Sequence, residues 1–181
     1  QTQCLSSLRQ LVMVNRLFVE EHGKTPGYDD PQYPGGTCMG SFKNYYKEEK
    51  LLLCPAAQLT GTPPTPEQIN GQGSAGSAWV RWTTDAKTMF VGSFGYNGWM
   101  YPDSKVDGDN AIYPQYFATR ESRIQKPSGT PVFMDENWVD AWPLETDKPV
   151  SDLYAGRPFS ERGDEMGRCT IARHGGRSPA S

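Results

Sequence analysis

The sequence has no hydrophobic run that approaches the roughly 20 residues needed to cross a bilayer, so the 181 residues contain no predicted membrane span. It also has no block of basic residues. With 18 Lys and Arg against 21 Asp and Glu, the net charge is −3, which argues against a nucleic-acid binder. Scattered Pro and Gly exclude a coiled coil and a repeat array.

The sequence lacks any C-x-x-C pair, so the usual zinc-ribbon and thioredoxin spacings are missing. Its four cysteines are Cys4, Cys38, Cys54 and Cys169. An even number in a loop-rich chain predicts two disulfides and an oxidising compartment, although three connectivities are open. Four buried thiols are one alternative. A zinc site of Cys38, Cys54, Cys169 and His174 is weaker, because these residues have no paired local spacing.

Aliphatic residues are scarce, whereas 19 Gly, 15 Pro and 12% aromatic residues are present. This composition is typical of a single domain with many turns and a core rich in aromatic side chains. Aromatic rings also stack on sugars, so a surface-displayed carbohydrate-binding module with an aromatic platform is an alternative function.

Residues 2–22 are predicted to form a helix. Its apolar residues lie three, four and seven apart, which predicts one buried face: Leu5, Leu8, Val12 and Val19, with Leu11 and Phe18 nearby. Further apolar residues widen this surface beyond one stripe: Met13, Val14 and Leu17. Arg9, Arg16 and Glu20 form a narrow polar strip. Gly23 at the C′ position and then Pro26 predict the end of the helix.

The remainder predicts an α+β fold, with a helix packed on a small antiparallel sheet and long ordered loops. Residues 24–77 are loop-rich, with a short helix at 41–50. Residues 78–177 carry the strands, predicted at 78–84, 89–96, 130–135 and 168–173. We expect Gly92 and Gly95 to mark a bulge or a close backbone approach, and Trp138 and Trp142 to anchor the irregular segment 136–167.

Two motifs suggest binding chemistry. The loop containing Asp103, Asp107 and Asp109 offers oxygen ligands suited to Ca²⁺, although it lacks the EF-hand spacing. Residues 71–76 (GQGSAG) match G-x-G-x-x-G. The dinucleotide fingerprint needs a strand before this motif and a helix after it, so a flexible loop is the better interpretation here.

Catalytic signatures are weak, and we predict that the protein is not an enzyme. His174-Gly175-Gly176 is similar to an esterase oxyanion loop, but the sequence has no G-x-S-x-G elbow. A hydrolase hypothesis depends on Asp135 and His174 meeting in space within hydrogen-bond reach.

Six segments, in order along the chain, resemble one known family. They are residues 4–11 (CLSSLRQL), 20–26 (EEHGKTP), 54–55 (CP), 93–97 (SFGYN), 131–135 (PVFMD) and 173–177 (RHGGR). Together they are similar to the soluble part of bacterial prepilin-type proteins with an N-terminal cleavage and methylation signal and a processing-associated His-to-Asp-Gly domain. Ser7 stands where the family usually has Asn, and the family's Asp-Gly would fall beyond Ser181.

This resemblance implies a fold like that of type II secretion pseudopilins, with residues 1–23 forming the C-terminal half of an anchor helix. It implies a leader and a hydrophobic segment ahead of Gln1, and a place in the periplasm or at the cell surface. The expected partners are other pilin-like subunits or secretion machinery. It also favours Cys4–Cys54 with Cys38–Cys169, while Cys38–Cys54 with Cys4–Cys169 stays open. No cofactor is expected apart from calcium.

Overall fold

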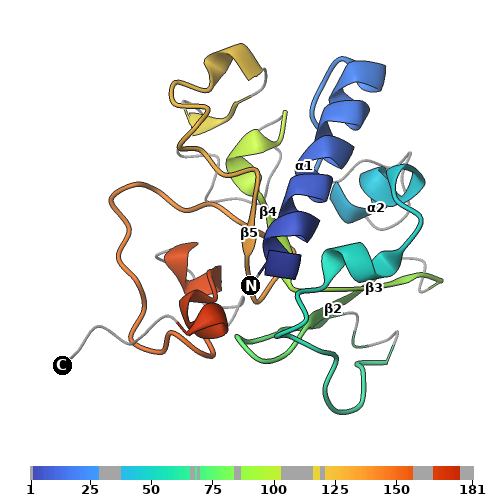
Figure 1. The fold of residues 1–181 in the computed structure, drawn as a ribbon, viewed down its shortest axis with the longest axis vertical. Coiled ribbons are helices and arrows are strands. Elements are labelled where there is room, and N and C mark those ends of the chain that lie inside the picture. Colours follow the sequence, from blue (N-terminus) through green and yellow to red (C-terminus); the bar gives the residue numbers. More distant parts are fainter. Residues whose placement is uncertain are drawn as a thin grey trace.

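A long helix packs against one of two small sheets, and long connecting segments surround them (Figure 1). The computed structural model describes residues 2–28, 38–65, 68, 70–83, 87–102, 116–118, 121–156 and 165–175. Its helices and strands are α1 (Thr2–His22), α2 (Cys38–Phe42), β1 (Asn70–Gly71), β2 (Trp79–Trp82), β3 (Met89–Gly92), β4 (Phe94–Asn97), β5 (Phe133–Asp135) and β6 (Asp140–Ala141). The fold is therefore α+β. None of the described helices is long and apolar enough to cross a membrane.

Helix α1 packs against α2, β5 and two 3-10 helices, η1 (Lys43–Tyr45) and η2 (Glu49–Leu52). Its buried residues alternate three and four apart: Cys4, Ser7, Leu11, Val14 and Phe18. The predicted face is only partly right, because the buried face is rotated around the helix towards Leu11 and Phe18, which are fully buried. Leu5 is 50% exposed, and Leu8, Val12 and Val19 are only half-buried.

The predicted end of α1 is confirmed. Gly23 adopts a left-handed conformation with φ of 67°, and its N–H donates to the Val19 carbonyl at 2.8 Å. This backbone conformation costs glycine little. The predicted polar strip of Arg9, Arg16 and Glu20 is exposed.

Two three-stranded sheets replace the single predicted sheet. The first has the order β1-β2-β3 and is antiparallel, whereas the second has the order β5-β4-β6, with β6 parallel to β4. The predicted strand 89–96 is divided at Ser93 between β3 and β4. There the Ser93 N–H donates to the Leu52 carbonyl at 2.8 Å, outside either sheet.

The strand predicted at 168–173 was wrong. Two 3-10 helices occupy this region, η7 (Glu165–Arg168) and η8 (Ile171–His174), and Cys169 makes only an isolated bridge with Glu136. The apolar alternation of Cys169 and Ile171 is typical of a strand. However, the Gly175 N–H donates to the Ala172 carbonyl at 3.1 Å, and this bond closes a helical turn.

The helix predicted at 41–50 is also only partly right. The observed segment runs through α2, η1 and η2 with a break between η1 and η2.

The core is built mainly from aromatic side chains under α1. Phe42, Tyr96 and Phe133 contact one another through their rings, with centroids 5.2 to 5.8 Å apart. The Tyr96 hydroxyl donates to Asn15 Oδ1 at 3.1 Å, which ties β4 to α1. Trp138 and Trp142 are buried, and this confirms their predicted role as packing anchors.

Candidate functional site

Four of the motif segments that lie far apart in the sequence meet at the N-terminal end of α1. Cys4 is in the first turn of α1, Cys54 follows η2, Asp135 ends β5 and His174 ends η8. Figure 1 shows the N-terminal end of α1 beside the helical turns of the C-terminal region. We call Cys4, Cys54, Asp135 and His174 the Cys-His-Asp cluster.

A disulfide joins Cys4 to Cys54, which confirms this pairing. Cys4 projects from the buried face of α1, so the bond links the start of the helix to the segment after η2. The Cys54 N–H donates to Ser93 Oγ at 2.7 Å. Ser93 lies at the junction of β3 and β4, and the disulfide is therefore anchored to the point where the two sheets separate.

The expected Cys38–Cys169 disulfide is wrong, because both residues are buried thiols that are not joined. Cys38 begins α2, and its thiol shares a hydrogen bond with Tyr101 near Asp140. Cys169 is held through its backbone against Glu136.

His174 lies between the disulfide and the carboxylate of Asp135. Its Nε2 atom is 3.7 Å from Cys54 Sγ and 3.4 Å from Asp135 Oδ2. Both the His174 and the Asp135 side chains are partly exposed, at 22% and 23%. The expectation that Asp135 and His174 could meet is therefore correct in space.

The arrangement differs from that of a catalytic triad. In a triad, the carboxylate holds one ring nitrogen and the nucleophile faces the other. Here Asp135 and Cys54 both face Nε2. Cys54 is also bonded to Cys4 rather than present as a thiolate. These residues do not form the nucleophile, base and orienting group that hydrolysis requires.

Arg173, the neighbour of His174, holds the surrounding backbone together. Its guanidinium is buried and donates to Asp135 Oδ1 at 2.9 Å. It also donates to four carbonyl oxygens, those of Ser74, Ala75, Ser93 and Glu136. Burial lowers the pKa of Arg173, while the hydrogen bond to Asp135 opposes that shift. The sequence pattern marked Arg173 only as part of a motif and gave no sign of this role.

Arg173 also explains the G-x-G-x-x-G segment, 71–76. Ser74 and Ala75 present their carbonyl oxygens to the guanidinium. Ser74 Oγ accepts hydrogen bonds from the backbone N–H groups of Gly76 and Ser77. The segment begins at Gly71, the last residue of β1, and precedes β2, not a helix. It is a hydrogen-bonded loop, as expected, and it lacks the helix that a dinucleotide fingerprint needs.

A second buried polar group lies under α2, around Asp140. The Tyr101 hydroxyl donates to Asp140 Oδ2 at 2.9 Å, and Arg168 Nη1 is 3.3 Å from Asp140 Oδ1. Burial raises the pKa of Asp140, and Arg168 and Tyr101 counter this only in part. Burial, together with the nearby Asp140 carboxylate, raises the pKa of the Cys38 thiol. The group is internal and therefore has the features of a structural network.

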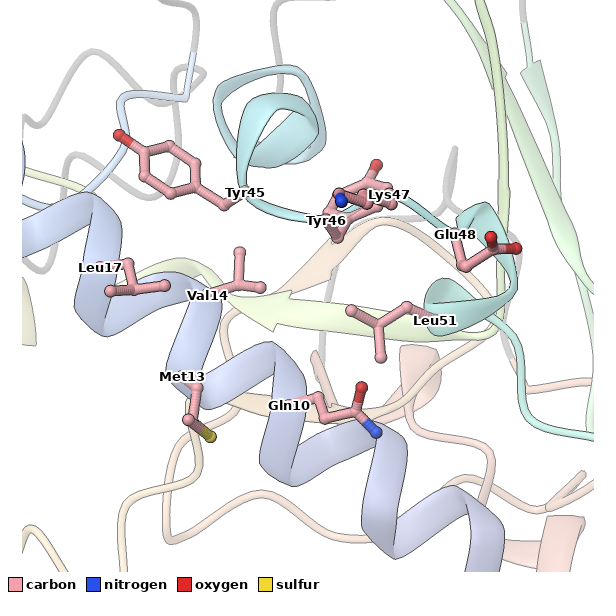
Figure 2. Close-up of a pocket in the computed structure, with 9 residues that line it drawn as sticks. All are labelled: Gln10, Met13, Val14, Leu17, Tyr45, Tyr46, Lys47, Glu48 and Leu51. Carbon is pink, nitrogen blue, oxygen red and sulfur yellow. The ribbon is translucent and has the colours of Figure 1, made fainter.

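An apolar groove runs along one edge of α1. It has a volume of about 320 Å³ and lies between α1 and the segment 45–51. Figure 2 shows Val14 and Leu17 on the helix side and Tyr45 and Leu51 on the opposite side. Met13 also borders it and is 63% exposed. Sequence patterning identified the excess of apolar residues on α1 but not this groove.

Two predicted sites remain, the calcium loop and the aromatic platform for carbohydrate. Asp103, Asp107 and Asp109, the proposed calcium ligands, lie outside the described residues. Most Trp side chains are in the core: Trp79, Trp99, Trp138 and Trp142. The half-buried Trp82 donates its indole N–H to the Pro64 carbonyl at 2.8 Å. Among the large aromatic residues that the structure describes, Tyr116 and Tyr154 are exposed.

No protein-family model, curated protein or solved structure matches this chain. The resemblance to prepilin-type proteins therefore stays a prediction from the motif residues. The convergence of Cys4, Cys54, Ser93, Asp135 and Arg173 around one point gives those motifs a common structural role.

Proposed function

We propose that this chain is a non-enzymatic, exported, pseudopilin-like subunit that acts through protein–protein contacts. The proposal rests on the resemblance of its ordered motifs to prepilin-type proteins and on a long N-terminal helix with an exposed apolar edge. Its site of action is the periplasm or the cell surface, where an oxidising environment maintains the Cys4–Cys54 disulfide. Anchoring requires a hydrophobic segment ahead of Gln1 in the full-length protein.

The observation that carries the proposal is the edge of α1 formed by Met13 and Leu17. They are 63% and 50% exposed and lie four residues apart, one above the other on the helix. They border the groove described above. Such side chains lose contact with water when another helix packs against them. Each Å² of apolar surface buried in this way stabilises the complex by roughly 25 cal/mol. The occupant we propose is the N-terminal helix of another pilin-like subunit.

The first test is processing of the full-length gene product in its native host. We expect a prepilin peptidase to remove a short leader, so that the mature protein seen by mass spectrometry is shorter than the translated product. Deletion of the peptidase gene should leave the leader in place. An uncleaved full-length protein that remains soluble and monomeric would contradict the proposal.

The second test places a photo-crosslinking amino acid at position 13 or 17 of the full-length protein. Both positions should crosslink to a protein that itself has a prepilin-type N-terminus. Leu17→Ser should reduce this product, because it removes apolar contact area. Leu5→Ser is the matched control. Leu5 is equally exposed at 50% but lies across the polar strip from Leu17. If both variants lose the crosslinked product equally, the contact does not depend on this edge of α1 and the assignment is wrong.

A further inference from the structure

Side chains of three metal-binding types meet in the Cys-His-Asp cluster. The donor atoms of Cys4, Cys54 and His174 all lie within 4.8 Å of one another. Asp135 Oδ2 is 3.4 Å from His174 Nε2, so a carboxylate oxygen lies next to this group. Two sulfurs, one imidazole nitrogen and one carboxylate oxygen are all established zinc donors. The sequence had suggested a different set, in which Cys38 and Cys169 took the places of Cys4 and Asp135.

The spacing of these atoms is close to that of a tetrahedral zinc site. In such a site the Zn–S bonds are near 2.3 Å, and the Zn–N and Zn–O bonds are near 2.0–2.1 Å. Tetrahedral angles then place a sulfur about 3.6 Å from a nitrogen, and a nitrogen about 3.4 Å from an oxygen. The observed separations are 3.7 Å for Cys54 Sγ to His174 Nε2 and 3.4 Å for His174 Nε2 to Asp135 Oδ2. To complete the site, the two sulfurs must separate from a covalent bond to about 3.8 Å apart. The Asp135 carboxylate, which lies outside the 4.8 Å group of Cys4, Cys54 and His174, must also move towards them.

The surroundings hold these donors in place. Arg173 binds Asp135 through Oδ1 at 2.9 Å, while Oδ2 is directed towards His174. Ser93 Oγ accepts the Cys54 N–H and fixes the backbone of that cysteine. Such outer contacts orient the ligands of metal sites. The side chain of His174, 22% exposed, gives an ion a route from solvent to the otherwise buried sulfurs.

We propose that reduction of the Cys4–Cys54 disulfide converts this cluster into a Zn²⁺ site with Cys4, Cys54, His174 and Asp135 as ligands. A dithiol reductant cleaves the S–S bond: it becomes a cyclic disulfide, and two cysteine thiols form. Zn²⁺ then binds both sulfurs as thiolates and releases two protons. The two states exclude each other, because the same sulfurs cannot be bonded together and separated by a metal ion. This inference is independent of the proposed pilin-like function.

The test uses the intact chain and Co²⁺ as a spectroscopic substitute for Zn²⁺. The protein is reduced with dithiothreitol, desalted under anaerobic conditions and titrated with Co²⁺. We expect a thiolate-to-cobalt charge-transfer band and intense visible bands of tetrahedral Co²⁺, which saturate at one ion per chain and disappear when Zn²⁺ is added. The oxidised protein should show neither band. Reduced protein without these bands would overturn the proposal.

Variants separate this site from other thiols and histidines. His174→Ala should weaken Co²⁺ binding by about 100-fold or more, and Asp135→Asn by about 10-fold. His22→Ala and Cys38→Ser are the matched controls, because they change the other histidine and a buried thiol outside the cluster. Bands that persist in His174→Ala, or that vanish in Cys38→Ser, would place the ion elsewhere and overturn the assignment.

Loss of the disulfide could also unfold the chain, and circular dichroism distinguishes this outcome. If the reduced protein is unfolded, Zn²⁺ should restore the native spectrum in the wild type and not in His174→Ala. A reduced protein that stays unfolded with excess Zn²⁺ would count against the site as decisively as the absence of cobalt bands.

Discussion

Arg173 connects segments of the described structure that lie up to 99 residues apart in the sequence. Its guanidinium donates to the turn at Ser74 and Ala75, to Ser93 between the sheets, and to Asp135 and Glu136 at the end of β5. Five donors in a rigid planar fork satisfy these acceptors, whereas a lysine has three donors on one atom. The buried acceptors therefore specify arginine rather than a positive charge alone.

We predict that Arg173→Met lowers the free energy of unfolding by about 3–5 kcal/mol, because it leaves a carboxylate and several carbonyl oxygens without their donor. Arg173→Lys should recover only part of the loss. Urea denaturation followed by fluorescence measures both values. The exposed Arg123 provides the control, and Arg123→Met should change stability by less than about 0.5 kcal/mol. Similar urea midpoints for Arg173→Met, Arg173→Lys and Arg123→Met would contradict the stabilising role of Arg173.

Gly95 lies where β4 passes very close to its neighbours. A Cβ atom built there would overlap the carboxylate of Glu136 and lie 2.7 Å from the Trp138 carbonyl oxygen. This observation confirms the predicted close backbone approach. Gly92 is similar, because a Cβ atom there would overlap the Trp79 ring. In both places the absence of a side chain allows another group to occupy the space.

Gly95→Ala should destabilise the fold by about 1–3 kcal/mol, since either the backbone or the Glu136 side chain must move. Gly129→Ala is a suitable comparison. The nearest atom to its added Cβ would be the Lys126 carbonyl oxygen at 3.8 Å, so stability should change by no more than about 0.5 kcal/mol. Thermal melts of the two variants test this difference, and a Gly95→Ala midpoint equal to that of Gly129→Ala would refute the prediction.

At the scale of elements, the disulfide fixes one end of α1 and aromatic contacts fix the other. Near the C-terminal end, Phe18 contacts the rings of Phe42 and Tyr45, and the Tyr45 hydroxyl donates to Glu21 Oε2 at 2.5 Å. Near the N-terminal end, Cys4 is bonded to Cys54 across a sequence separation of 50 residues. The first turns of α1 consequently depend on the oxidation state of this bond more than the last turns do.

The chain-entropy model assigns about 4 kcal/mol to a loop of this length. We predict that dithiothreitol lowers the melting temperature of the wild type in the absence of metal, and that it has no effect on a Cys4→Ala/Cys54→Ala double variant. Hydrogen exchange should show the greatest loss of protection in residues 4–11, next to the broken bond. A uniform loss of hydrogen-exchange protection along α1, or an unchanged melting temperature, would contradict the local role of the disulfide.

At the scale of the whole molecule, the buried Asp140 gives stability an unusual dependence on pH. Burial raises the pKa of Asp140 in the folded protein above its unfolded value of about 3.9. Between these two pKa values the folded state retains a proton that the unfolded state has lost. The contribution of Asp140 to stability is therefore complete below about pH 4 and decreases as pH rises through the folded pKa.

The measurement compares the wild type with Asp140→Asn by urea denaturation at a series of pH values. The stability advantage of the wild type over the variant should be largest at acid pH and should shrink as pH rises above about 4, until Asp140 is ionised. A difference that grows with increasing pH would mean that Asp140 is stabilised as a carboxylate, contrary to the raised pKa.

Local patterns were sufficient to predict several elements. The helix at 2–22 and its end at Gly23 follow from apolar spacing and from glycine at the C′ position. Strand formers on either side of a short connection predicted the antiparallel pair β2 and β3. Both kinds of signal lie within short windows of sequence, and this is why they were recoverable without tertiary information. The Cys4–Cys54 pairing followed only from the resemblance, because the cysteine spacing leaves three connectivities open.

Contacts between distant segments decided the rest. The buried face of α1 is set by α2, β5 and the 3-10 helices packed against it, since an excess of apolar residues allows the helix more than one orientation. The break between β3 and β4 at Ser93 and the hydrogen bonds of Arg173 depend on contacts between residues dozens of positions apart. Apolar spacing determined that this chain begins with a helix, whereas packing determined which side chains it leaves exposed and which groups it brings to Cys4.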